Sequence, residues 1–116
     1  MHDYRTECQT VKLLHEVDAT KLGSVVAEMR QLGAPRVRAV WDDANAIWHA
    51  AEGTHRLTAA AQLGLIPTIV EISWEDAADL LNAESGSDWT GEALLDASTR
   101  GSDWARFPEP LEFTEP

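Results

Sequence analysis

Residues 50–67 read AAEGTHRLTAAAQLGLIP, and this stretch decides the fold that we expect. Residues 46–51 are predicted to be a strand, because they follow a run of turn-forming Asp and Asn residues at 42–45. A helix is predicted from Thr54 to about Leu63, where Gly64 closes it, and residues 67–72 form a further β-branched strand. The stretch therefore predicts a tight turn that joins a strand to a helix.

The chain before this stretch predicts a strand, a helix and a second strand. Residues 9–15 read as the first strand. Asp18 is a good N-cap for a helix with apolar residues at helical spacing, and Gly33 and Pro35 end this helix near residue 32. Residues 36–41 form the strand that pairs with 46–51 as a hairpin. This order predicts an α+β domain over residues 9–74, with a mixed sheet, a hairpin and packed helices.

Residues 75–116 are predicted to be an acidic extension. Short helices are expected at 75–82 and 90–97, followed by an extended or disordered tail. The tetrapeptide Gly-Ser-Asp-Trp occurs at 86–89 and again at 101–104, which we interpret as two similar caps or turns whose tryptophans pack onto the body. Two copies are too few for a repeat fold.

The charge is strongly negative and unevenly distributed. The chain has 9 Lys and Arg against 20 Asp and Glu, a net charge of −11. Residues 1–74 hold 7 basic and 9 acidic residues, and residues 75–116 hold 2 and 11. Such a chain is poorly suited to duplex DNA, because phosphate neutralisation needs a basic face, although one small anion can still bind locally.

Other features indicate a cytoplasmic protein. No apolar stretch approaches the roughly 18 residues of a membrane span, and the N-terminus has no apolar run typical of a secretory signal. Cys8 is the single cysteine, which excludes an internal disulfide and a cysteine-based zinc site. The four histidines show no paired spacing, so no metal site is predicted.

The turn at residues 52–56 carries the chemistry that predicts a function. Gly53 lets the backbone approach a ligand without a Cβ, and the N–H groups at the start of the next helix favour an anion such as a phosphate. His55 and Arg56 add side-chain donors. Glu52 and His55 are the candidate catalytic residues, for proton transfer or for orienting a metal. The stretch therefore predicts a phosphate or nucleotide site.

Simpler explanations exist for the same residues. The backbone of the turn by itself can require a glycine at position 53. Arg56 lies early in its helix, where the dipole disfavours a cation, so either an anionic ligand or a salt bridge to Glu52 or an aspartate explains it. The other basic group, which either guides a nucleotide or is a solvated face, consists of Arg30, Arg36 and Arg38.

This stretch resembles the ParB/sulfiredoxin superfamily, and the match covers roughly residues 9–74. ParB-type N-terminal domains carry a glycine, a polar pair ending in arginine, an alanine-rich helix and an Ile-Pro strand entry. The corresponding residues here are Gly53, His55-Arg56, Ala59-Ala60-Ala61 and Ile66-Pro67. The context of a strand before and a helix after makes the match better than a bare short pattern.

The resemblance implies a bound nucleotide triphosphate, CTP as in ParB relatives or ATP as in sulfiredoxins, with Mg²⁺ as a further candidate ligand. By position, the phosphate cradle would be Gly53, Thr54, His55 and Arg56. Glu52 loosely matches the acidic residue that assists metal or proton transfer in relatives that phosphorylate small molecules. Thr54 stands where sulfiredoxins have a cysteine, so peroxiredoxin repair is not expected.

Three functions follow as alternatives. The first is a nucleotide-dependent switch or a small phosphohydrolase or phosphotransferase. The second is a non-catalytic interaction or inhibitor protein, whose acidic extension mimics nucleic acid or acts as a lid on the basic turn. The third is a ParB-like DNA nuclease, which the acidic charge disfavours. A nucleotide-binding domain without a DNA-reading half would suit a phage or a mobile element.

Overall fold

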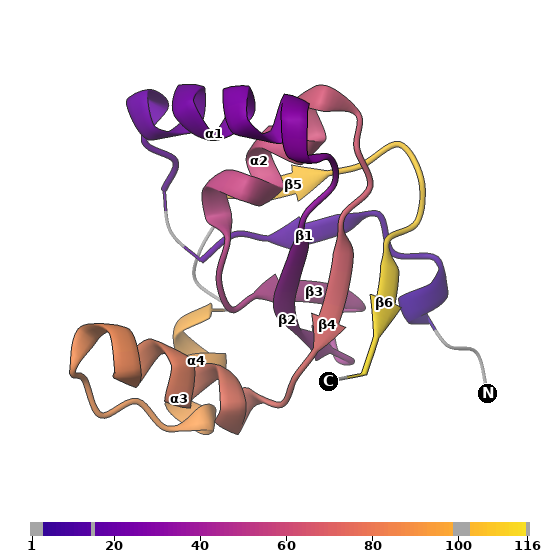
Figure 1. Ribbon diagram of the computed structural model, residues 1–116. Helices are drawn as coiled ribbons and strands as arrows, with labels where there is room; N and C mark the ends of the chain where they lie inside the picture. Colours follow the sequence, from indigo (N-terminus) through magenta and orange to yellow (C-terminus); the bar gives the residue numbers. More distant parts are fainter. Residues whose placement is uncertain (1–3, 15, 99–102, 116) are drawn as a thin grey trace.

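The computed structural model describes residues 4–14, 16–98 and 103–115. The chain forms an α+β domain around one six-stranded mixed sheet, as predicted (Figure 1). The elements in chain order are a 3₁₀ helix (Tyr4–Thr6), β1 (Thr10–Lys12), α1 (Ala19–Leu32), β2 (Arg36–Asp42), β3 (Ile47–Ala50), α2 (Thr54–Leu63), β4 (Thr68–Glu71), α3 (Trp74–Ser85), α4 (Gly91–Ser98), β5 (Trp104–Arg106) and β6 (Glu112–Thr114). The strand order in the sheet is β5-β1-β3-β2-β4-β6.

The centre of the sheet is the predicted hairpin. β2 and β3 pair antiparallel, with Val40 opposite His49 and Trp41 opposite Trp48. β1 pairs parallel with β3, and β4 pairs parallel with β2. The turn at residues 52–53 therefore leaves the middle of the sheet and leads directly into α2.

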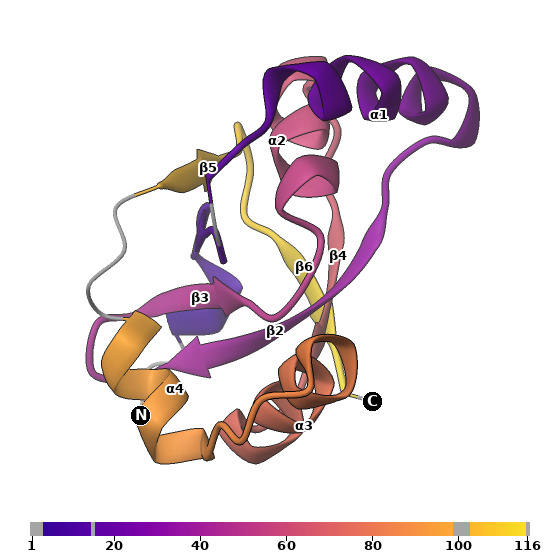
Figure 2. The same cartoon turned by 90° about the vertical axis from the view of Figure 1, so that its left-hand side faces the viewer.

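Alternation along the strands divides the core into two clusters, one on each face of the sheet. Val37 and Ala39 of β2 pack with buried residues of α1 and α2, whereas Val40 packs with Ala77 of α3 and Leu94 of α4. Figures 1 and 2 show α1 beside α2 at one end of the molecule and α3 beside α4 at the other. None of the described helices has the length and apolar composition that a membrane span requires.

The helix ends follow local sequence signals. The Asp18 side chain accepts a hydrogen bond from the backbone N–H of Lys21, and Gly33 ends α1 with φ 82°. Gly64 ends α2 in the left-handed region, as predicted. α3 and α4 lie where the two short helices are predicted, and Ser73 caps α3 through its hydroxyl.

The sheet does not stop at residue 74, because residues 104–106 and 112–114 of the tail, predicted as extended or disordered, form two of its strands. β5 pairs antiparallel with β1, and β6 pairs parallel with β4, so the tail forms both edges of the sheet. Ala105, Phe107 and Leu111 are buried in the same cluster as Val11. Three-residue strands carry too little alternation to be recognised in a sequence, and the partners of β5 lie more than ninety residues earlier in the chain.

Candidate functional site

The predicted turn lies between the end of β3 and the start of α2. Gly53 has φ 74°, in the left-handed region that favours glycine. A Cβ at this position would lie 3.1 Å from Cγ1 of Val37 on β2 and 3.3 Å from Nη2 of Arg56. The backbone of the turn and its close approach to the sheet therefore explain the glycine without a ligand.

Thr54 and His55 turn into the protein. His55 is buried, and its Nε2 accepts a hydrogen bond of 2.9 Å from the backbone N–H of Asp18. This bond ties the start of α2 to the N-cap of α1. Thr54 is 2% exposed, and its hydroxyl has no hydrogen-bond partner within the described parts of the chain. The expected contacts of these two side chains with an external phosphate do not fit this arrangement.

Glu52 lies between two guanidinium groups. Its Oε2 accepts hydrogen bonds from Nε of Arg38 at 2.8 Å and from the Arg38 backbone N–H at 3.1 Å, and its Oε1 lies 3.3 Å from Nη2 of Arg38. Nη2 of Arg56 lies 3.5 Å from the same Oε1. The hydrogen bond from Arg38 holds the pKa of Glu52 below its usual value and outweighs the effect of partial burial. An ionised, paired carboxylate does not fit the proposed role in proton transfer.

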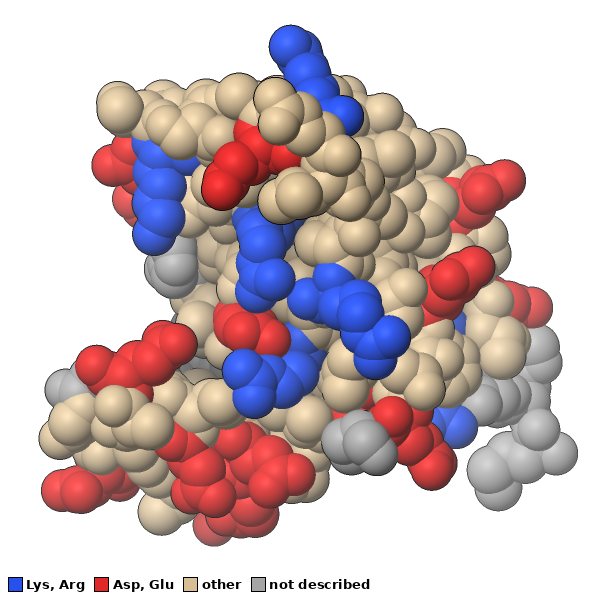
Figure 3. Space-filling model, in the orientation of Figure 1, with Lys and Arg blue, Asp and Glu red and all other residues tan. Residues whose placement is uncertain are grey.

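Arg36 completes the basic group, which we call the arginine cluster: Arg36, Arg38 and Arg56. Arg36 and Arg38 are two residues apart on β2, so both side chains point to the same face of the sheet. Nη1 of Arg56 donates to the Arg36 carbonyl at 3.2 Å. Figure 3 shows several basic side chains gathered near the middle of the side of the molecule that it draws, with acidic side chains crowded on the lower part. Arg30 lies in the last turn of α1 and takes no part in these contacts.

Two hollows flank the arginine cluster. One, of about 180 Å³, is lined by Arg56, by Val25, Glu28, Met29 and Leu32 of α1, and by residues 33–35. The other, of about 380 Å³, is lined by Arg38, Ile72, Asp76, Asp79, Leu80 and Ala83. The Arg56 side chain is 43% exposed, so its contact with Glu52 leaves part of the guanidinium open to solvent. The carboxylate between Arg38 and Arg56 belongs to Glu52, whereas Asp76 and Asp79 of the acidic extension share the second hollow with Arg38.

A buried polar cluster of Asp42 and His49 lies between β2 and β3, and the sequence patterns did not predict it. Nε2 of His49 lies 2.9 Å from Oδ2 of Asp42, and Nδ2 of Asn45 donates to the same oxygen at 2.8 Å. Lys12, which is also buried, lies beside His49 in the register of β1 and β3, with its Nζ 5.7 Å from the ring centre of Trp104. The hairpin predicted from the sequence could have indicated this contact, because a turn at 42–45 places Asp42 and His49 on neighbouring strands.

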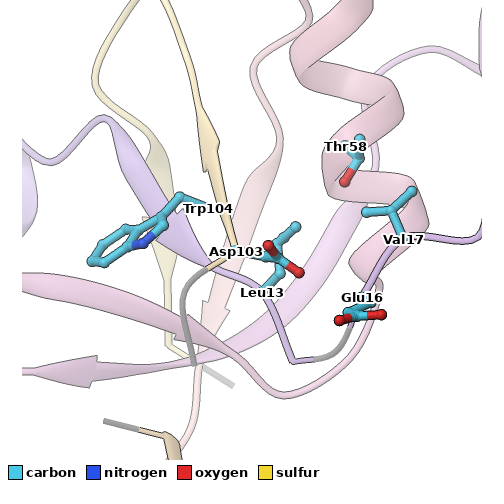
Figure 4. A pocket seen from close by; sticks show the side chains of 6 residues that line it. All are labelled: Leu13, Glu16, Val17, Thr58, Asp103 and Trp104. Carbon is cyan, nitrogen blue, oxygen red and sulfur yellow. The ribbon is translucent and has the colours of Figure 1, made fainter. Parts of the chain in front are cut away.

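A further open pocket of about 410 Å³ lies near α2 and β5. It is lined by Leu13, Glu16, Val17, Thr58, Asp103 and Trp104 (Figure 4). The Thr58 hydroxyl donates to the Thr54 carbonyl, and Figure 4 shows the Trp104 ring extending away from Glu16, Val17 and Thr58. Within the described ranges, no three His, Cys, Asp or Glu side chains gather as a metal site.

Searches against models of protein families, curated proteins and solved structures found no match to this chain. The resemblance to the ParB/sulfiredoxin superfamily therefore rests on the motif at residues 53–67 and its strand–helix context.

Proposed function

We propose that the chain binds a phosphate-bearing ligand at the arginine cluster, with a nucleotide such as ATP or CTP as the first class to test. The observation that carries this proposal is the convergence of Arg38 and Arg56 on a single carboxylate, with Arg36 beside them, in a chain of net charge −11. Two guanidinium groups around one anion, with a third arginine on the same strand as Arg38, form a local positive site in a negative molecule. Guanidinium groups bind phosphate oxygens in pairs. The resemblance to the ParB/sulfiredoxin superfamily is the reason to test nucleotides first among phosphate-bearing ligands.

The start of α2 supports the same ligand chemistry. The N-cap residue of this helix is Gly53, which has no side chain that could accept hydrogen bonds from the first backbone N–H groups. A ligand oxygen can accept them instead. Arg56 is the third residue of α2, where the helix dipole disfavours a cation and favours an anion beside it. A phosphate next to Arg56 would be stabilised by both the guanidinium and the dipole. Mg²⁺, if required, would arrive with the phosphates.

The geometry favours binding over turnover. Both candidate catalytic groups are engaged, Glu52 with Arg38 and His55 with the N-cap of α1. We therefore propose a ligand-binding or switch role in place of phosphoryl transfer or hydrolysis.

Binding is tested by titrating ATP, CTP, ADP and pyrophosphate, with and without Mg²⁺, while the thermal unfolding of the full chain is followed. A ligand at 100 times its Kd adds about 2.7 kcal/mol to the free energy of unfolding. Arg36→Ala and Arg56→Ala each remove one guanidinium group that would bind the ligand, which we expect to weaken binding about 10- to 100-fold. Arg30→Ala is the matched control, because it removes the same charge from outside the cluster. Absence of stabilisation by all four ligands would contradict the proposal.

A specific observation also favours the second function, an interaction protein that uses an acidic surface. Residues 74–98 contain seven Asp and Glu and no Lys or Arg. Asp76 and Asp79 line a hollow whose other walls include the apolar side chains of Ile72 and Leu80. Arg38 lines the same hollow, but its guanidinium is paired with Glu52, so the two carboxylates and the apolar walls suit a basic partner segment with an apolar anchor.

A basic, leucine-containing peptide of defined sequence is a suitable probe for this second function. The double variant Asp76→Asn/Asp79→Asn is expected to weaken its binding several-fold more than the charge-matched variant Glu109→Gln/Glu115→Gln in the tail. Equal losses would indicate diffuse attraction to a negative chain, which would remove the support for a defined interface.

A further inference from the structure

We propose that Glu52 determines which anions the arginine cluster accepts, because its carboxylate occupies the position of a ligand oxyanion and has to be displaced. A ligand with one negative charge gains little by replacing Glu52, whereas pyrophosphate or a nucleotide triphosphate brings several charges to the same donors. This inference rests on the proposed function and adds a selection rule to it, namely preference for polyphosphates over singly charged anions.

The contacts of Glu52 are those expected of a bound oxyanion. Its two oxygens accept hydrogen bonds from two side-chain nitrogens of Arg38 and from the Arg38 backbone N–H. One of the oxygens also lies near Nη2 of Arg56. Phosphate oxygens use the same bidentate arrangement with guanidinium groups. Glu52 therefore competes for the donors that an incoming phosphate would use.

The strength of the Glu52 contacts permits displacement. The side chains of Arg38, Arg56 and Glu52 are 46%, 43% and 24% exposed, and ion pairs at such exposure are individually weak. Glu52 lies in the bend between β3 and α2, outside both elements, so its side chain can turn toward solvent without changing the backbone of either one. The Arg38 backbone N–H of β2 then loses its Glu52 acceptor and becomes a further donor for the ligand. Once it turns away, the nitrogens of Arg38 and Nη2 of Arg56 that face Glu52 become available to the ligand, while Nη1 of Arg56 keeps its bond to the Arg36 carbonyl.

Acetate, inorganic phosphate, pyrophosphate and tripolyphosphate form a series of rising charge that tests this rule on the full chain. In the wild-type protein we expect affinity to rise steeply along the series. Glu52→Gln removes the competing charge. Because one charge-assisted competitor is lost, we expect this variant to bind inorganic phosphate about tenfold more tightly. The rise in affinity along the series should also become smaller. Glu52→Asp keeps the charge on a shorter side chain and should give intermediate values.

Glu71→Gln is the matched control. Glu71 pairs with Arg5 at 2.7 Å on β4 and contacts no member of the arginine cluster, so its loss changes the net charge equally. We expect Glu71→Gln to leave the preference for polyphosphate over phosphate unchanged. Thermal unfolding of each variant, measured without anions, identifies any variant that fails to fold, and Glu52→Asp then carries the comparison.

The outcomes separate the inference from the function. If the wild-type chain binds pyrophosphate and Glu52→Gln neither tightens phosphate nor flattens the series, the inference is overturned and the proposed function stands. If only Glu52→Gln binds anions, the inference stands and the proposed function fails for the natural chain. If no protein in the set binds any anion, both fail.

Discussion

The Asp42 carboxylate accepts a hydrogen bond from Nε2 of His49 at 2.9 Å, and both side chains are 5% exposed. An ionised carboxylate can only accept hydrogen bonds, so Nε2 carries the hydrogen. Burial lowers the pKa of His49 below 6.5 and outweighs the opposite effect of Asp42, so the imidazole is neutral at pH 7. Burial also raises the pKa of Asp42, but the hydrogen bonds from Asn45 and His49 outweigh it and leave that pKa below 3.8.

This pair predicts a stability that falls with acid in two steps. Unfolded His49 takes up a proton as the pH falls through 6.5, while the folded imidazole resists it, so its contribution is complete above pH 6.5 and declines below. The contribution of Asp42 is present above pH 3.8 and is lost as the pH falls through its lowered folded pKa. Urea unfolding of wild type and His49→Gln between pH 7.5 and pH 5 tests the first step. A difference between the two proteins that does not change with pH would contradict it.

Asp42 also holds the turn of the hairpin, and its removal should be costly. Asp42→Ala leaves the buried His49 donor without this acceptor and removes two hydrogen bonds from Asn45. We expect a loss of about 1–3 kcal/mol in the free energy of unfolding. The neighbouring Asp43 is exposed and accepts one long bond from Trp41, so Asp43→Ala is expected to change stability by about 0.5 kcal/mol or less. Chemical denaturation of both variants checks the contrast, and equal losses would show that the buried pair contributes nothing of its own.

Gly53 is required by its backbone and by its neighbours. Gly53→Ala places a Cβ against Val37 at a φ of 74°, and Gly64→Ala has a similar φ of 70° with no atom within 4 Å of the added carbon. Left-handed backbone alone costs about 1–2 kcal/mol for a residue with a Cβ. We therefore expect this loss for Gly64→Ala and a larger loss for Gly53→Ala in thermal unfolding. A smaller effect at position 53 would mean that the turn can move away from β2.

The Thr54 hydroxyl is a buried donor without a partner in the described structure, which predicts an unusual substitution. Thr54→Val keeps the shape and removes the polar group, so it should be neutral or stabilise the fold by up to about 1–3 kcal/mol. Thr58→Val is the control. The Thr58 hydroxyl donates to the Thr54 carbonyl at 2.9 Å, so its removal breaks a hydrogen bond and should not stabilise the fold. If Thr54→Val destabilises the chain in urea unfolding, the hydroxyl has a solvent or ligand partner.

The tail belongs to the core, so a truncation in it should act as a core mutation. Phe107 directly follows β5 and is 3% exposed, and its backbone N–H donates to the Gln9 carbonyl. Phe107→Ala is expected to cost about 3–5 kcal/mol in chemical denaturation. Pro108→Ala, one residue further along in an exposed position, should change stability much less. A mild effect of Phe107→Ala would mean that the tail contributes little to the stability of the core.

Local signals account for the part of the fold that sequence reasoning predicts correctly. The N-cap at Asp18, the C-caps at Gly33 and Gly64, and the hairpin turn after Asp42 each depend on residues within about four positions of one another. The candidate site is predicted less completely. Its position at the start of α2 follows from the same local signals, but the inward turn of His55 depends on Asp18, thirty-seven residues away.

The sequence by itself determined the helices, the hairpin, the glycine at the turn and the concentration of acid after residue 74, because these depend on neighbouring residues or on composition alone. Only the tertiary structure decided that β5 and β6 close the sheet, that Asp42 meets His49, and that Glu52 lies between Arg38 and Arg56. The physical reason is that pairing between distant strands and the direction of a side chain are set by packing and burial across the fold, which no short stretch of sequence contains.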